Sequence, residues 1–104
     1  MKRLYRTNEE NCNCDFSIDR SLFSPPVRVQ GGQKRAYENI LLVESGGRYK
    51  LETQSVDRIK ILTGSGHFKW ARGEISFCAE DIFVAEEIGE YEINGVCSFI
   101  VMRK

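Results

Sequence analysis

The sequence holds one histidine, His67, and histidine is both the side chain that titrates nearest neutral pH and a common metal ligand. On a strand, His67 faces away from the alternating aromatic residues Phe68 and Trp70. We therefore expect a surface histidine. It stays a candidate acid, base or metal ligand, although nothing in the sequence supplies a partner that would orient it.

The four cysteines divide into two pairs with different surroundings. Cys78 and Cys97 lie in apolar stretches and are predicted to be buried thiols. Cys12 and Cys14 lie in a polar run, where a Cys-x-Cys pair holds a soft metal only if further ligands converge on it. A metal or redox role for this pair is one hypothesis. The start of the chain lacks a signal-peptide pattern, so we expect all four thiols to be reduced.

Carboxylates could replace imidazoles as ligands of a hard metal, and Asp57, Glu90 and Glu92 are the candidates. Carboxylates more often stay solvated, and Glu86, Glu87 and Glu90 are expected to form an acidic rim. The interpretation we favour assigns no catalytic residue, no metal and no cofactor to the chain.

The aromatic residues are the better indication of a binding site. They could stack against a sugar or a flat organic ligand, or they could simply fill the core, which is the more common role. The predicted ligand pocket consists of Tyr49, Leu51, Thr53, Phe83, Tyr91 and Phe99.

The length and charge of the chain limit the kinds of partner it can bind. The chain has 104 residues, enough for one domain, and its 15 basic and 15 acidic residues cancel. No global field attracts nucleic acid or an anionic membrane, and no apolar run approaches the roughly 20 residues of a spanning helix. We expect a cytoplasmic protein whose partner is a small molecule or a second copy of the chain. The second copy would make the protein a homodimer.

The elements that must position these side chains are strands. Residues 48–53 alternate, with Tyr49, Leu51 and Thr53 predicted to face the interior, and residues 40–43 are apolar throughout, as in a strand covered on both faces. Glycine turns are expected within 45–47, 64–66 and 94–95, with further corners at 72–74 and 80–81. The pattern predicts an all-β antiparallel sandwich or barrel.

The chain divides unevenly into an N-terminal arm, residues 1–35, and a barrel, residues 36–104. Within the arm, residues 16–18 and 27–29 are possible edge strands, and Pro25 with Pro26 marks a turn or an exposed edge.

The order of strands and turns resembles the cupin family, and in particular the metal-free C-terminal cupin-like domain of type I mannose-6-phosphate isomerases. The segment Asp81–Gly95 carries the resemblance best, with an acidic corner, a short apolar strand and a Tyr-x-Ile-x-Gly ending. It departs from the isomerase pattern at Glu80, which replaces a glycine, and at Ala85, which replaces a proline. The resemblance implies a cupin-type double-stranded β-helix, or jelly-roll barrel.

The first cupin motif places its glutamate at Asp57, its two histidines at Leu51 and Thr53, and its leading glycine at Ser45. The histidine of the second motif falls near Glu90 or Tyr91. All three family histidines are missing, so the resemblance does not imply the family metal site. Without these histidines, the region that forms the active site in the family is predicted to be an apolar pocket in this chain.

Three functions are consistent with these observations. The first is a degenerate, non-catalytic cupin that binds a small sugar-like or organic ligand or acts as an interaction module. The second is a sugar-phosphate enzyme or accessory subunit, which rests on the resemblance alone. In that family the catalytic zinc site lies in a different domain, so isomerase activity of this chain by itself is not expected. The third is a metal or redox protein working through Cys12 and Cys14.

Overall fold

A computed structural model describes residues 2–12 and 14–103. Residues 1 and 104, at the ends of the predicted arm and barrel, and residue 13, inside the Cys-x-Cys pair, lie outside the described residues. The elements are β1 (Arg3–Thr7), α1 (Glu9–Cys12), the short 3-10 helix η1 (Arg20–Leu22), β2 (Val27–Val29), β3 (Gly32–Tyr37), β4 (Ile40–Glu52), β5 (Val56–Trp70), β6 (Gly73–Cys78), β7 (Ile82–Glu86) and β8 (Glu90–Arg103). Among them, no helix is long and apolar enough to cross a bilayer.

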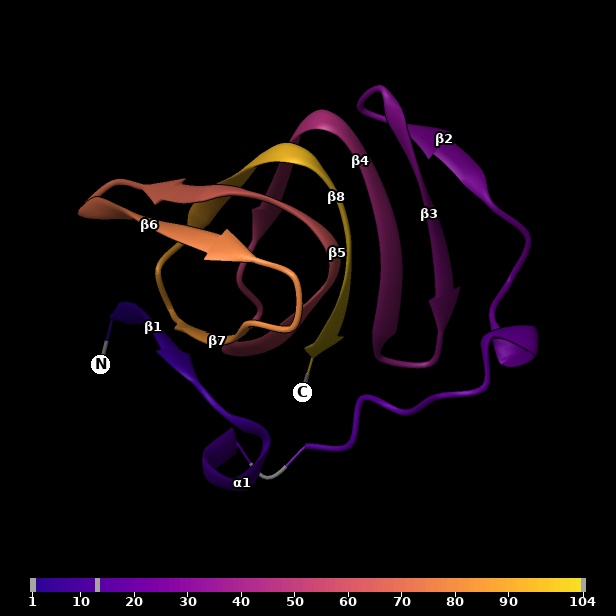
Figure 1. The fold of residues 1–104 in the computed structure, drawn as a ribbon, viewed down its shortest axis with the longest axis horizontal. Helices are drawn as coiled ribbons and strands as arrows, with labels where there is room; N and C mark the ends of the chain where they lie inside the picture. Colours follow the sequence, from indigo (N-terminus) through magenta and orange to yellow (C-terminus); the bar gives the residue numbers. More distant parts are fainter. Residues whose placement is uncertain (1, 13, 104) are drawn as a thin grey trace.

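The strands form one antiparallel sheet that rolls up around an interior without closing (Figure 1). The strand order is β1-β7-β5-β8-β4-β3-β2, and β6 pairs with the part of β5 that β7 leaves free. The long strand β8 lies between β4 and β5 over most of its length. The prediction of an antiparallel all-β fold is confirmed.

Three predicted glycine turns are wrong, because β4, β5 and β8 each continue through them. The glycines lie side by side, with Gly47 opposite Gly95 and Gly66 next to Asn94 on the neighbouring strand. A Cβ on Gly66 would overlap the backbone carbonyl of Asn94, and a Cβ on Gly95 would overlap that of Ser65. Glycine here permits the close backbone approach that lets three paired strands bend together. The corners predicted at 72–74 and 80–81 are present slightly earlier, as turns at 71–72 and 79–80.

Apolar side chains form two core clusters, one inside the rolled sheet and one on its outer surface. The outer cluster lies under residues 8–12 and 14–24, where Cys12, Phe16 and Phe23 pack on the sheet. Residues 16–18 form no strand, so that prediction is wrong, although Phe16 is buried. As predicted, residues 40–43 are covered on both faces, since Val43 belongs to the inner cluster and Leu42 to the outer one.

Candidate functional site

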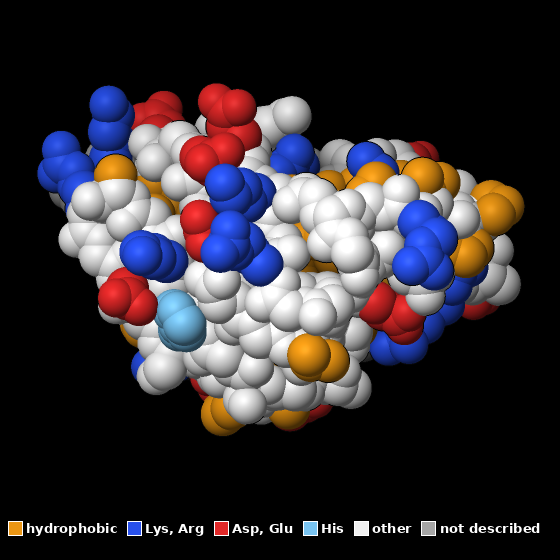
Figure 2. Space-filling view, turned by 90° about the horizontal axis from the view of Figure 1, so that it is seen from above, with side chains coloured by type: hydrophobic (Ala, Val, Ile, Leu, Met, Phe, Trp, Pro, Cys, Tyr) orange, Lys and Arg blue, Asp and Glu red, His pale blue; other side chains and the backbone are white. Residues whose placement is uncertain are grey.

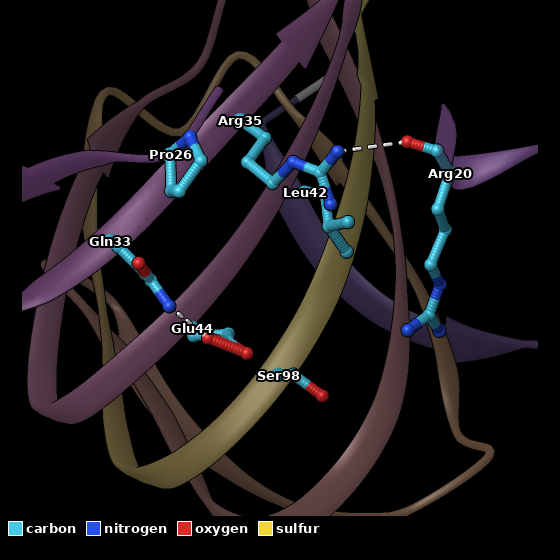
Figure 3. A pocket seen from close by; sticks show the side chains of 7 residues that line it. All are labelled: Arg20, Pro26, Gln33, Arg35, Leu42, Glu44 and Ser98. Atoms are coloured by element: carbon cyan, nitrogen blue, oxygen red, sulfur yellow. Dashed lines mark hydrogen bonds between the residues drawn. The ribbon is translucent and has the colours of Figure 1, made fainter. Parts of the chain in front are cut away.

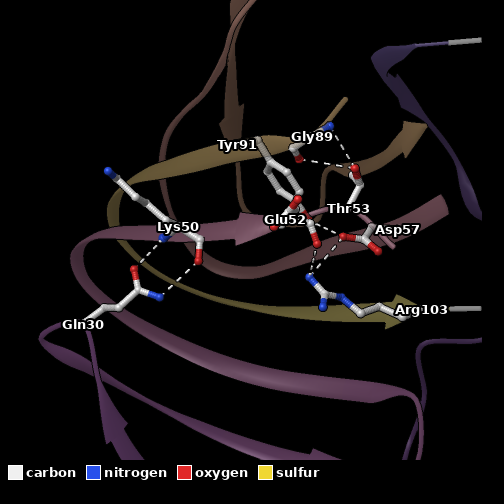
Figure 4. Close-up of polar contacts among 8 residues, drawn as sticks. All are labelled: Gln30, Lys50, Glu52, Thr53, Asp57, Gly89, Tyr91 and Arg103. Atoms are coloured by element: carbon white, nitrogen blue, oxygen red, sulfur yellow. Dashed lines mark hydrogen bonds and ion pairs between the residues drawn. The ribbon is translucent and has the colours of Figure 1, made fainter. Parts of the chain in front are cut away.

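A buried carboxylate, Asp57, lies at the start of β5 in the position that the cupin motif gives to its glutamate. Tyr91 donates its hydroxyl hydrogen to Asp57 Oδ2 at 2.8 Å, and Arg103 Nη2 lies 3.4 Å from the same oxygen. Arg103 Nη2 also donates to the carbonyl of Glu52 at 3.0 Å (Figure 4). Asp57, at the motif position, is therefore paired with Arg103, a cation from the same chain.

The bend of β8 makes this cluster possible. Arg103 is the cross-strand partner of Asp57 at the end of β8, whereas Tyr91 lies near the beginning of the same strand. A straight strand would separate Tyr91 and Arg103 by roughly 40 Å. Because β8 curls through Gly95, both side chains reach one carboxylate from two sides of the interior.

Burial dominates the protonation of this cluster. Desolvation raises the pKa of Asp57 above its usual 3.8, although the hydrogen bond from Tyr91 and the charge of Arg103 oppose the shift. Burial and the neighbouring carboxylate hold the pKa of Tyr91 well above its usual value near 10. Two buried polar atoms, Asp57 Oδ1 and Arg103 Nε, have no hydrogen-bond partner within the described residues.

Thr53, a predicted pocket residue, joins the β4–β5 loop to the β7–β8 loop. Its backbone N–H donates to the carbonyl of Gly89 at 3.0 Å, and the N–H of Gly89 donates to Thr53 Oγ1 at 3.0 Å. The Thr53 hydroxyl hydrogen returns to the same carbonyl at 3.2 Å. The hydroxyl therefore holds this end of the barrel together.

The remaining predicted pocket residues line the interior. Tyr49, Phe83, Tyr91 and Phe99 are buried in the inner cluster, and half-buried Leu51 pairs with Tyr91 across the strands. Tyr49 contacts Phe99 edge to face at a centroid distance of 6.0 Å, and the rings of Phe83 and Tyr91 both contact Phe68. The structure brings these residues together, and their role in binding stays a prediction.

The candidate metal ligands do not form a metal site in the described part of the chain. Within residues 2–12 and 14–103, no three His, Cys, Asp or Glu side chains form a group that could hold a metal ion. His67 is 44% exposed, as the alternation predicts, and Figure 2 shows the histidine at the surface among charged side chains. Its Nε2 lies 3.4 Å from Glu74 across the β5–β6 hairpin, a partner that the sequence did not reveal.

The cysteine predictions are half correct. Cys97 is buried, and burial raises the pKa of its thiol to about 11. Cys78 is exposed, contrary to the prediction, because Phe77 takes the inward position at the end of β6. Cys12 is buried in the outer cluster, against which the half-buried Cys14 packs.

A rim cleft of about 400 Å³ opens where β5 ends and β8 begins. Trp70 faces it from the last position of β5, next to Tyr91 on β8 and Ile88 in the preceding loop. In the described part of the chain, the charged groups of Lys69 and Glu90 have no hydrogen-bond or ion-pair partner. The lining residues are Lys69, Trp70, Ala71, Ile88, Glu90, Tyr91 and Glu92.

Sequence reasoning missed Trp70 and Arg103. Trp70 carried a usable signal, since it shares the inward face with Phe68 at the end of a hairpin. Arg103 carried none, because its place opposite Asp57 depends on the register in which β8 pairs with β5.

No protein-family model and no curated protein matches the sequence. Among solved structures, the mannose 6-phosphate isomerase from Bacillus subtilis is similar at a TM-score of 0.68 and 18% identity, over 88% of this chain and 30% of the isomerase. A cupin-2 domain containing protein from Shewanella frigidimarina is similar at a TM-score of 0.52 and 14% identity, over 93% of this chain and 100% of that one.

A third similar structure is a protein of unknown function from Acinetobacter, at a TM-score of 0.55 and 14% identity over 78% of this chain and 90% of that one. At these identities the likeness concerns the fold. The chain has the cupin-type fold that the sequence resemblance implied, and it spans less than a third of the isomerase's length.

Proposed function

We propose that the chain is a non-catalytic cupin module that binds a small sugar-like ligand at the rim cleft. The observation that carries the proposal is the composition of this cleft, where half-buried Trp70 lies beside the charged groups of Lys69 and Glu90, which are unpaired within residues 2–12 and 14–103. An aromatic ring packs against the apolar face of a sugar, and charged groups around it hydrogen-bond to the hydroxyls.

The non-catalytic part of the proposal rests on how the motif positions are used. Thr53 is bonded to Gly89, and Asp57 Oδ2 is shared by Tyr91 and Arg103. The side chain of Leu51 has no polar atom. A group that already has buried partners must lose them before it can bind or activate a substrate, and this loss is costly.

Fluorescence tests the proposal directly, because Trp70 is the single tryptophan of the chain. Titration of the intact chain with mannose should change its emission saturably, and Glu90→Gln should abolish the change. Arg72→Gln, in the exposed turn after Trp70, is the matched control and should titrate like the parent chain. The absence of a saturable change with mannose and with mannose 6-phosphate would refute the proposal.

The same titration addresses the sugar-phosphate alternative. Mannose 6-phosphate should bind more tightly than mannose only if Lys69 pairs with the phosphate, and Lys69→Gln should then remove the difference. For the cysteine hypothesis, the described contacts offer little support, since Cys12 is 7% exposed within the outer cluster.

We further propose that the module forms a homodimer through the edge strand β2. Two large apolar side chains are half exposed there, Val27 on β2 at 53% and Leu22 on η1 at 52%. Light scattering coupled to size exclusion should give the mass of two chains, and Val27→Lys should give that of one. A parent chain that elutes with the mass of one would rule out this interface.

A further inference from the structure

A second pocket, of about 180 Å³, lies on the outer surface of the sheet, away from the rim cleft. The sheet forms its floor and the segment before β2 forms one side (Figure 3). That segment is held in place, since Ser24 exchanges hydrogen bonds of 2.8 and 3.0 Å with the backbone of Ala36 on β3. The lining residues are Arg20, Pro26, Gln33, Arg35, Leu42, Glu44 and Ser98.

Arg35 is fixed in this pocket before any ligand arrives. Its Nε donates to the carbonyl of Ser24 and its Nη2 to the carbonyl of Arg20, each at 3.0 Å. A guanidinium has five N–H donors, so three of them are left. Since the neighbouring carbonyls hold the group, little side-chain entropy remains to be lost when the remaining donors bind an anion.

Arg20 supplies a second cation. In Figure 3 its side chain lies on the other side of Leu42 from Pro26, and its guanidinium has no hydrogen-bond or ion-pair partner within the described residues. The only acid in the lining, Glu44, accepts a hydrogen bond from the amide of Gln33. The two arginines and this one acid leave a net positive charge in the lining.

The rest of the lining is suited to a short apolar body. Leu42, which is 7% exposed, lies on the floor and Pro26 forms part of the wall. Ser98 contributes a hydroxyl that shares a 2.6 Å hydrogen bond with Thr63. A volume of this size corresponds to roughly six water molecules, so only a compact ligand fits.

We infer that this pocket binds a small organic carboxylate. A guanidinium pairs with a planar carboxylate through two parallel hydrogen bonds, and the apolar floor accepts a short alkyl chain. A phosphate dianion suits the pocket less well, because it has no apolar part to place on Leu42 and its second negative charge adds to the repulsion from Glu44. The site is independent of the proposed function at the rim.

Calorimetric titration of the intact chain with butyrate tests the inference, with butyramide as the uncharged analogue. Butyrate should bind and butyramide should not. Arg20→Gln should weaken butyrate binding about tenfold or more, since hydrogen bonds to charged groups are among the strong ones. Arg20 is exposed, so this variant should fold, and unchanged thermal unfolding would verify that it does.

The control is Arg72→Gln, which removes an exposed arginine from the β5–β6 turn and should leave butyrate binding unchanged. Equal affinity for butyrate and butyramide, tighter binding of inorganic phosphate, or undiminished binding by Arg20→Gln would each overturn the inference. No heat of binding at about 50 mM butyrate would do the same. Because Trp70 reports on the rim cleft alone, failure of either site is seen separately.

Discussion

The interior of the rolled sheet and the rim cleft meet at Tyr91, and they differ in how their polar groups are used. Inside the barrel, the Tyr91 hydroxyl, Asp57 and Arg103 bond to one another away from solvent. At the rim, the charged groups of Lys69 and Glu90 face a cleft and have no hydrogen-bond or ion-pair partner among the described residues. The difference teaches that the polar groups at the cupin motif position already have partners within the fold, whereas the charged groups at the rim are available to the ligand proposed above.

The largest expected effect comes from removing the internal cation. Arg103→Met leaves the Asp57 carboxylate buried without a charge partner, which costs about 3 to 5 kcal/mol when a buried pair is broken. Urea denaturation measures the loss. Arg58→Met is the matched control, since Arg58 is a half-buried arginine with no ion pair in the described residues, and it should lose far less. Equal losses of unfolding free energy in the two variants would mean that Arg103 contributes no more than an ordinary half-buried arginine.

The second-largest loss of stability is expected from a substitution at the bend that β5 and β8 share. In Gly66→Ala the new Cβ would overlap the backbone of Asn94, so β5 and β8 must shift, at about 2 to 3 kcal/mol. Gly73→Ala should be close to neutral, because its Cβ would meet only the Trp70 ring at ordinary contact distance. Thermal or urea unfolding compares the two, and a neutral Gly66→Ala would contradict the role given to the bend.

Breaking the link between the β4–β5 and β7–β8 loops should cost less unfolding free energy. Thr53→Val removes the hydroxyl that accepts from the N–H of Gly89, and we expect a loss of about 1 to 2 kcal/mol in unfolding free energy. Thr63→Val removes an exposed hydroxyl of the same type and should change stability by only a few tenths. If both variants unfold alike, the link between the loops contributes nothing beyond an ordinary surface contact.

The smallest effect is a dependence on pH. The pKa of Asp57 is raised in the folded state, so its contribution to stability is full below the usual value of 3.8 and falls as pH rises through the folded pKa. Asp57→Asn removes this term. The difference in unfolding free energy between parent and variant should therefore shift against the parent as pH rises from 3.8, and a shift in its favour would contradict the account.

Much of the fold could be predicted because alternation reports which face is buried. Tyr49 and Phe68 lie inside, and His67 lies at the surface, as their positions on the strands indicate. The glycine predictions failed because a turn and a bend require the same residue, and only the neighbouring strand distinguishes them. The sequence places Asp57 at the motif, but the pairing of Arg103 with Asp57 depends on the register of β8 against β5, which no local pattern encodes.

The central claim, that Arg103 serves as the internal cation for the buried carboxylate at the cupin motif, is tested most directly by a double-mutant cycle. Urea unfolding of the parent chain, Asp57→Asn, Arg103→Met and the double variant gives the coupling free energy between the two side chains. We predict a coupling of about 2 kcal/mol or more, with the double variant more stable than Arg103→Met alone. Additive losses, within about 0.5 kcal/mol, would contradict the account.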